Sequence, residues 1–100
     1  MKNAKLIAKK LRAKLREYND FVGLYLYGSQ ITQEARADSD IDIVAIFENV
    51  KDDYDDIILK AWDIEIKNNV IIDFHPFSLK QLDLDPFYFN EVKKGIYYAR

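Results

Sequence analysis

The 100-residue sequence contains no cysteine, which excludes disulfide bonds and zinc sites held by thiolates. Its three glycines and two prolines are too few to indicate a linker, so we predict a single domain over residues 1–100. No apolar run approaches the ~20 residues of a membrane-spanning helix, and no signal-peptide pattern opens the chain. The content of 49% hydrophobic and 32% charged residues is typical of globular proteins. We therefore expect a cytoplasmic protein that makes no membrane contact.

Acidic residues are absent from the first sixteen positions, although the whole chain has a net charge of −2. The basic residues of this segment are Lys2, Lys5, Lys9, Lys10, Arg12, Lys14 and Arg16. Apolar residues three and four apart predict an amphipathic helix here, with the basic side chains opposite its buried face. We interpret the basic face as solvated and do not expect direct nucleic-acid binding; a contact with RNA or protein is the alternative.

Hydrophobic periodicity predicts the order helix, strand, strand, helix, strand, helix. The expected elements are a helix over residues 3–18, strands over Phe21–Tyr27 and Ile41–Phe47, a helix from Asp52–Asp56 to Asn68-Asn69, a strand over Val70–Phe77, a helix from Asp85-Pro86 to Gly95, and an edge strand at Ile96–Tyr98. This order predicts an α/β (α+β) fold, with a small mixed β-sheet and helices mainly on one face. The other face, or one end of the sheet, would be open for a site.

Three aspartates interrupt the strand-like runs. Asp40 and Asp42 are two residues apart, so in a strand their carboxylates point the same way, roughly 6.6–6.8 Å apart along the chain. Asp73 lies in another strand, and all three acids converge if the two strands are neighbours. Clustered carboxylates repel unless they are protonated or bridged by cations. Oxygen donors without cysteine or histidine at ligand spacing favour Mg²⁺ or Mn²⁺, and two such ions suit phosphoryl or nucleotidyl transfer.

A Gly-Ser pair, Gly28-Ser29, follows the first predicted strand. Glycine allows the backbone to approach a phosphate closely, and the amides of a new helix N-terminus can receive it. Alone, such a pair is more often an ordinary turn at the end of a strand. Its combination with Asp40 and Asp42 favours a phosphate-binding turn.

This combination resembles the polymerase-β-like nucleotidyltransferase superfamily. From Gly28 to Val44 the chain reads G-S-Q-I-T-Q-E-A-R-A-D-S-D-I-D-I-V. It aligns without a gap to G-S-R-A-R-G-E-A-R-P-D-S-D-I-D-L-x, the usual pattern of the minimal MNT branch, whose members are encoded beside HEPN partners. The resemblance implies the polymerase-β-like fold. One departure is Gln30–Gln33, where relatives often have R-A-R-G, so two cations and a glycine near the phosphates are missing.

The resemblance also implies roles for individual residues. Asp40 and Asp42 would bind two Mg²⁺ ions, and Asp73 would bind one of them and activate the acceptor hydroxyl. Gly28 and Ser29 would hold a nucleoside triphosphate. Arg36 matches the family pattern and would either meet a phosphate or pair with a nearby acid. These assignments make Asp40, Asp42 and Asp73 the predicted catalytic and metal-binding residues.

Two other polar positions have more ordinary interpretations. His75 shares the predicted face of Asp73 and could lie at the rim of the site, but we interpret it as a solvated or hydrogen-bonded structural histidine. Asp83 and Asp85 form a second D-x-D pattern before Pro86. The proline and the position after the third strand favour a turn and a helix cap.

The resemblance implies an enzyme that transfers AMP from ATP to a hydroxyl. The expected acceptor is a tyrosine of a HEPN toxin, which would make the chain an antitoxin and a protein adenylyltransferase. A binding module that neutralises a HEPN partner without catalysis is the alternative, favoured by the departure at Gln30–Gln33. An enzyme that modifies antibiotics or other small molecules is a third, weaker interpretation, since such relatives usually carry a further domain.

Overall fold

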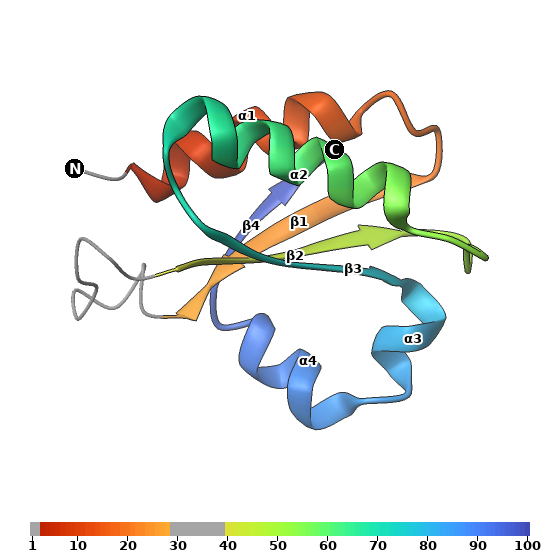
Figure 1. Ribbon diagram of the computed structural model, residues 1–100. Coiled ribbons are helices and arrows are strands. Elements are labelled where there is room, and N and C mark those ends of the chain that lie inside the picture. Colours follow the sequence, from red (N-terminus) through yellow and green to blue (C-terminus); the bar gives the residue numbers. More distant parts are fainter. Residues whose placement is uncertain (1–2, 29–39) are drawn as a thin grey trace.

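The computed structural model describes residues 3–28 and 40–100 (Figure 1). Its elements are α1 (Ala4–Leu15), β1 (Phe21–Tyr27), β2 (Ile41–Phe47), α2 (Asp55–Asn68), β3 (Ile72–Ser78), α3 (Leu79–Asp83), α4 (Pro86–Val92) and β4 (Ile96–Ala99). The predicted order of elements is therefore present, including the edge strand β4. Helix α3 is an addition that the hydrophobic periodicity did not predict.

The four strands form one mixed sheet in the order β3-β2-β1-β4. Strand β1 pairs antiparallel with both β2 and β4, whereas β2 and β3 are parallel. A parallel pair needs a crossover connection, and α2 supplies it between β2 and β3. This arrangement confirms the predicted fold class, an α+β fold with a small mixed β-sheet.

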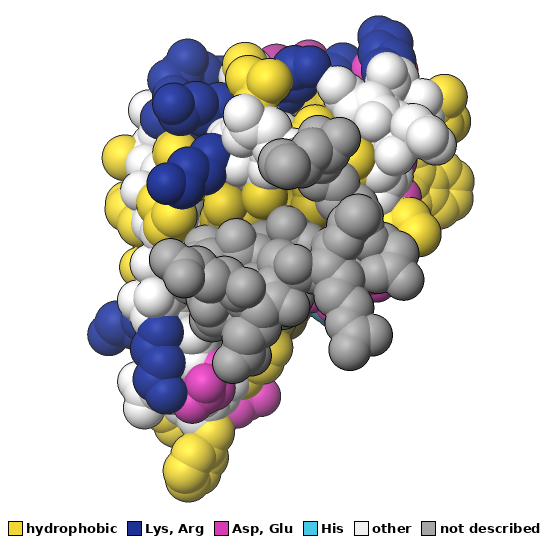
Figure 2. Space-filling model, turned by 90° about the vertical axis from the view of Figure 1, so that its left-hand side faces the viewer, with side chains coloured by type: hydrophobic (Ala, Val, Ile, Leu, Met, Phe, Trp, Pro, Cys, Tyr) yellow, Lys and Arg dark blue, Asp and Glu magenta, His cyan; other side chains and the backbone are white. Residues whose placement is uncertain are grey.

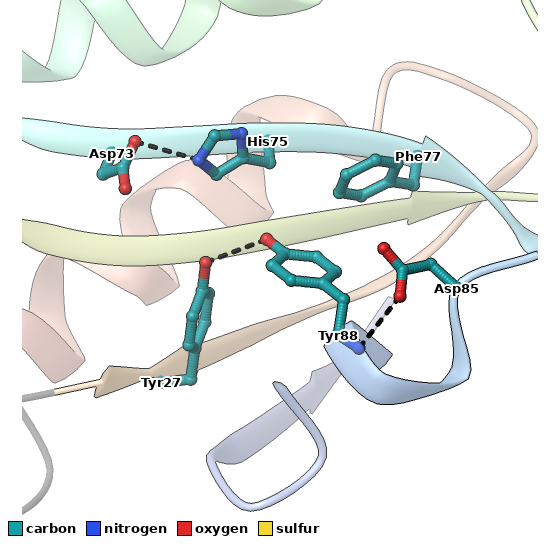
Figure 3. Close-up of a pocket in the computed structure, with 6 residues that line it drawn as sticks. All are labelled: Tyr27, Asp73, His75, Phe77, Asp85 and Tyr88. Carbon is teal, nitrogen blue, oxygen red and sulfur yellow. Dashed lines mark hydrogen bonds and ion pairs between the residues drawn. The ribbon is translucent and has the colours of Figure 1, made fainter. Parts of the chain in front are cut away.

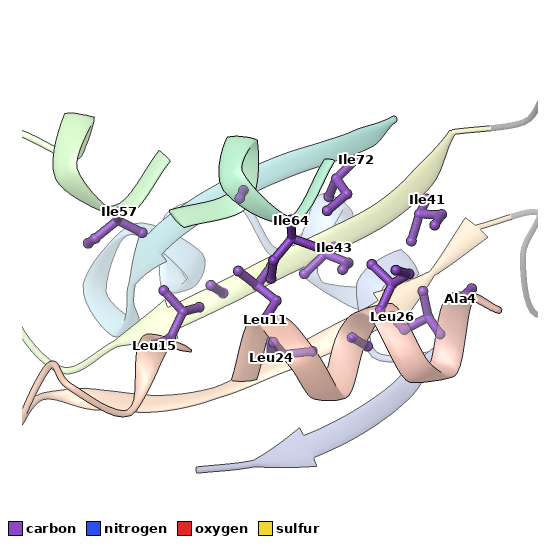
Figure 4. Packing of buried hydrophobic residues seen from close by; sticks show 14 of the residues in the cluster. Ala4, Leu11, Leu15, Leu24, Leu26, Ile41, Ile43, Ile57, Ile64 and Ile72 are labelled. Carbon is purple, nitrogen blue, oxygen red and sulfur yellow. The ribbon is translucent and has the colours of Figure 1, made fainter. Parts of the chain in front are cut away.

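The two long helices, α1 and α2, lie side by side on one face of the sheet (Figure 1). Figure 4 shows Leu11 and Leu15 of α1 and Ile64 of α2 beside the strand residues Leu24 and Ile43. All five side chains are almost completely buried. Burying an aliphatic side chain of this size contributes about 1.5–3 kcal/mol, so this layer is the main source of stability.

The short helices α3 and α4 lie on the opposite face (Figure 1). They bury Leu82 and Val92 against Val44 and Ile46 of β2. Helices therefore cover the first face more completely, as predicted, but the second face is only partly open. Because side chains alternate along β2, Asp42 shares this second face with Val44 and Ile46.

Local sequence signals explain where the short helices begin. Ser78 and Gln81 form a capping box at α3, in which the Ser78 hydroxyl accepts from the Gln81 amide and the Gln81 side chain accepts from the Ser78 amide. Asp85 caps α4, and Pro86 occupies its first turn. The expected cap role of Asp85 is thus confirmed.

The hydrophobic spacing of α2 predicts that Tyr54, Ile57, Ile58, Ala61 and Trp62 form its buried face, and this prediction is wrong for Trp62. The side chains of α2 that are buried are Ile57, Ala61 and Ile64, whereas Trp62 is 56% exposed. Two apolar stripes run along this helix, and only one of them faces the sheet.

The basic face of α1 is partly used within the fold. Lys10 donates to Oδ1 of Asn68 at 2.8 Å, and Lys14 forms a 2.6 Å ion pair with Asp63, both on α2. Lys5 remains exposed. Figure 2 shows most of the visible Lys and Arg side chains on the upper part of the molecule, where the long helices lie, and a smaller group at the lower left. Among the described residues, no helix is long and apolar enough to span a membrane.

Candidate functional site

Gly28 follows the last residue of β1 and adopts a left-handed backbone conformation with φ of 80°. A Cβ at this position would collide with Oδ2 of Asp42. Glycine is therefore required here both by the backbone angle and by the close approach of the chain to a carboxylate. Ser29 and Arg36, the other predicted nucleotide-binding residues, lie outside the described residues, as does the segment Gln30–Gln33.

Asp42 and Asp73 lie directly opposite each other in the parallel pair of β2 and β3. Their carboxyl groups are close enough to share a hydrogen bond when one of them is protonated. The two acids therefore lie close together, as predicted. They do so because the crossover through α2 places β3 alongside β2. Neighbouring strands are ~4.8 Å apart, which brings side chains at matched positions into contact.

Asp40 lies just before β2 and is exposed. Its charge acts on Asp42, and the pair of Asp42 and Asp73 is thus accompanied by a third acid. Within residues 3–28 and 40–100, however, no group of three or more acidic, histidine or cysteine side chains could hold a metal ion. The structure therefore brings two of the predicted ligands together without completing a three-acid site.

The environment of Asp42 raises the pKa of its carboxyl group to about 6. Burial is the largest cause, followed by the hydrogen bond and the charge of Asp73 and by the charge of Asp40, while His75 acts in the opposite direction. Such a pair is stable when it shares a proton or binds a cation. Its oxygen donors are of the type that a hard divalent cation prefers.

A hollow of about 380 Å³ opens beside Asp73, between β3 and α4 (Figure 3). Its lining consists of Tyr27, Asp73, His75, Phe77, Asp85 and Tyr88. We call it the ring-lined pocket. Three of the six residues come from alternate positions of β3, which share one face of the sheet.

His75 contacts Asp73 directly, with 2.9 Å between Nε2 of the imidazole and Oδ1 of the carboxylate. The imidazole also stacks on Phe77, at 6.4 Å between ring centroids. The expected hydrogen-bonded histidine is therefore present, and its partner is a predicted site residue. The i, i+2 spacing in a strand was the signal that places both side chains in this pocket.

The hydroxyl groups of Tyr27 and Tyr88 form a hydrogen bond of 2.9 Å. Tyr27 lies at the end of β1, and Tyr88 lies in α4. Burial is the largest cause of the raised pKa of both phenols, and the charges of Asp42 and Asp73 add to it. Both hydroxyls are therefore neutral in the pocket. Sequence reasoning did not find these residues, because no spacing along the chain indicates that α4 folds back beneath β1.

The geometry thus combines a glycine turn, a close carboxylate pair and an adjoining pocket large enough for a ring. Carboxylates that bind divalent cations beside a close-approach turn suit transfer of a phosphate-bearing group. Asp73 belongs to both parts, since it pairs with Asp42 and lines the pocket. It can therefore receive a proton from a hydroxyl group that is bound there.

Comparison with known protein families also indicates the transfer of a phosphate-bearing group. The family model described as polymerase beta, nucleotidyltransferase, matches residues 9–97, a span that includes Gly28, Asp40, Asp42 and Asp73. No curated protein matches the chain. The matched span is most of the chain, so this protein belongs to the polymerase beta nucleotidyltransferase family.

Proposed function

We propose that the chain is a Mg²⁺-dependent nucleotidyltransferase that transfers AMP from ATP to a hydroxyl group and releases pyrophosphate. The observation that carries this proposal is the pairing of Asp42 with Asp73 next to the backbone of Gly28. A chain that had lost all need for this chemistry would gain stability by separating or replacing these carboxylates.

The proposal assigns different roles to the residues of the site. Asp42 and Asp73, with Asp40, would hold Mg²⁺, which when bound neutralises charge on the phosphates and lowers the pKa of the acceptor hydroxyl. The backbone at Gly28 and Ser29 binds the triphosphate. Asp73 accepts the proton of the acceptor hydroxyl, and His75 holds one oxygen of that carboxylate in place.

The acceptor in this proposal is a tyrosine of a HEPN toxin, and the chain acts as its antitoxin in the cytoplasm. The ring-lined pocket supports an aromatic acceptor, because Tyr27, Phe77 and Tyr88 surround it with ring surfaces. Phe87, the residue before Tyr88 on α4, is 87% exposed. Exposed aromatic residues beside a site are typical of contacts with a protein partner.

Incubation of the chain with labelled ATP, Mg²⁺ and the protein encoded by the neighbouring gene tests the proposal. We expect label on the partner with the wild type and none with Asp42→Asn. Asp63→Asn serves as the matched control, because it removes one carboxylate from α2, where Asp63 pairs with Lys14 of α1, away from the carboxylate pair. Labelling that persists in Asp42→Asn would contradict a role of the carboxylate pair.

A binding module without catalysis is the second candidate. It is favoured by the finding that no group of three metal-ligating side chains forms among the described residues. In that case the double variant Asp40→Asn with Asp42→Asn still protects cells from the toxin. Protection that disappears in the double variant, with partner binding intact, supports the enzyme.

A further inference from the structure

We propose that the ring-lined pocket selects an acceptor that combines a phenol ring with a positive charge. This inference rests on the proposed function and deepens it, since it specifies the chemical class of acceptor. The shared chemistry is a phenolic hydroxyl, an aromatic ring and a cationic group placed beyond the ring. A small aminoalkyl phenol and a tyrosine side chain flanked by lysine or arginine both provide it.

The walls of the pocket are mainly aromatic. Phe77 and Tyr88 meet edge to face at 5.7 Å between centroids, and Tyr27 meets Tyr88 in the same way at 6.4 Å. His75 stacks on Phe77 and continues this surface along β3. Aromatic rings pack favourably against such edges and faces. The pocket volume of about 380 Å³ suits a single ring with a short chain.

An acidic side chain lies at each end of the pocket. In Figure 3, Asp73 lies at one end of the row of β3 side chains, and Asp85 lies below Phe77 at the other end, beside Tyr88. None of the six lining residues that the structure describes is lysine or arginine, and the imidazole of His75 is already paired with Asp73. Ring faces and carboxylates both attract cations and disfavour anions.

The chemistry of the transfer fixes the direction of the acceptor. Asp73 is the acid that adjoins Asp42, so the hydroxyl lies at the Asp73 end. Its oxygen forms a bond to the α-phosphorus of ATP, the bond from that phosphorus to the oxygen bridging to the β-phosphate breaks, and pyrophosphate leaves. The proton passes to Asp73. The far end of the acceptor then lies near Asp85, where a positive charge is stabilised.

Asp85 offers a specific test because it has two separable roles. Its Oδ1 accepts from the backbone amide of Tyr88 at 3.1 Å and caps α4. Asparagine caps helices as well as aspartate does, so Asp85→Asn removes the charge and keeps the cap. Asp83→Asn is the matched control, because Asp83 is an exposed acid at the end of α3 that does not line the pocket.

The experiment compares three phenols as acceptors with the full chain, ATP and Mg²⁺: tyramine, which is cationic, p-cresol, which is neutral, and 4-hydroxyphenylacetate, which is anionic. We expect the KM for tyramine to be about tenfold below that for p-cresol, with the anionic phenol poorest. Asp85→Asn should remove the advantage of tyramine over p-cresol. Asp83→Asn should preserve it. Equal KM values for tyramine and p-cresol in the wild type would overturn the inference.

A second measurement does not depend on transfer. His75 is the only histidine of the chain, so its ring protons give an assignable NMR signal. Tyramine should shift this signal without ATP, and Asp85→Asn should raise the concentration of tyramine that is required about tenfold. If tyramine binds in this way but neither the phenols nor the partner protein is labelled, the pocket assignment stands and the proposed function fails. If tyramine leaves the signal unmoved, the pocket assignment fails.

Matched peptides distinguish the two sources of the acceptor. A short tyrosine peptide with an adjacent lysine is compared with the same peptide carrying glycine at that position. Preference for the lysine peptide over both the glycine peptide and tyramine supports a protein acceptor, whereas preference for tyramine supports a small one. Either result supports a cationic phenol. Equal use of the two peptides, together with no preference for tyramine over p-cresol, contradicts it.

Discussion

At the scale of single residues, Gly28 brings the backbone of the turn into close contact with the carboxylate of Asp42. Its positive φ and the space that Asp42 occupies both exclude a side chain. Gly28→Ala should therefore destabilise the fold by about 1–3 kcal/mol, by backbone strain and by displacing the Asp42 carboxylate. Urea unfolding measures the first effect, and loss of nucleotide transfer measures the second.

Gly23→Ala is the control for this prediction. Gly23 lies in β1, and a Cβ there would meet the side chain of Tyr97, which is exposed and can move. We expect Gly23→Ala to lower stability while leaving the activity per folded molecule unchanged. A Gly28→Ala protein with normal transfer would show that the turn and Asp42 are not coupled.

His75 acts through its contact with Asp73. His75→Ala removes the donor to Oδ1 of Asp73 and should lower kcat by about tenfold, because a partner that orients a metal-binding carboxylate typically contributes this much. The KM for ATP should change little. His75→Gln retains an N–H donor and should restore most of the activity. Equal loss in both variants would show that the imidazole itself, rather than its hydrogen bond, is required.

The residues within one stretch of sequence were the most predictable part of the site. Gly28, Asp40 and Asp42 lie within fifteen positions, so their pattern is visible without a structure. Asp73 was predictable because a strand of alternating character surrounds it. Tyr88 was not, because its place beside Tyr27 depends on how α4 packs beneath the sheet, and no local pattern encodes that packing.

At the scale of elements, strands and long helices were predicted well because each has a regular apolar period. Helix α3 was missed because its start depends on the capping box of Ser78 and Gln81, a polar signal within a short segment. The burial of α2 was misjudged at Trp62 because two apolar stripes satisfy the same spacing. Only contact with the sheet distinguishes one stripe from the other.

The residue before β1 and the segment that follows β2 are joined by the ion pair of Asp20 and Lys51, whose atoms Oδ2 and Nζ are 2.8 Å apart. Burial alone would raise the pKa of Asp20, but the hydrogen bonds and charge of Lys51 outweigh it and lower that pKa. Because the folded pKa is depressed, the stabilisation is present above the usual aspartate value of about 3.9 and is lost as the pH falls below it.

Lys51→Met should accordingly lower the free energy of unfolding by about 0.5–1 kcal/mol at pH 7 and by much less at pH 3. Urea unfolding at the two pH values measures the difference. Lys94→Met is the control, because Lys94 pairs with Glu91 on an exposed surface and should contribute almost nothing. A Lys51→Met effect that is the same at both pH values would assign the loss to packing instead of to the ion pair.

At the scale of the whole molecule, the two faces of the sheet serve different purposes. The face under α1 and α2 buries a continuous apolar cluster and contributes most of the stability. The face with α3 and α4 has a smaller cluster and contains Asp42, Asp73 and the ring-lined pocket. The division follows from alternation along β2 and β3, which directs odd and even positions to opposite faces.

This division predicts that the site lowers the stability of the metal-free protein. Asp42 and Asp73 repel each other at neutral pH, and Asp42 is the more buried of the two. In a chelating buffer at pH 7, Asp42→Asn should therefore melt a few degrees above the wild type. Mg²⁺ should raise the Tm of the wild type, because ligands that bind only the folded state stabilise it, and should leave that of Asp42→Asn nearly unchanged. The prediction is contradicted if the wild type melts above Asp42→Asn in chelator and its Tm does not change with Mg²⁺. The two carboxylates would then stabilise the fold themselves and would not form a cation site.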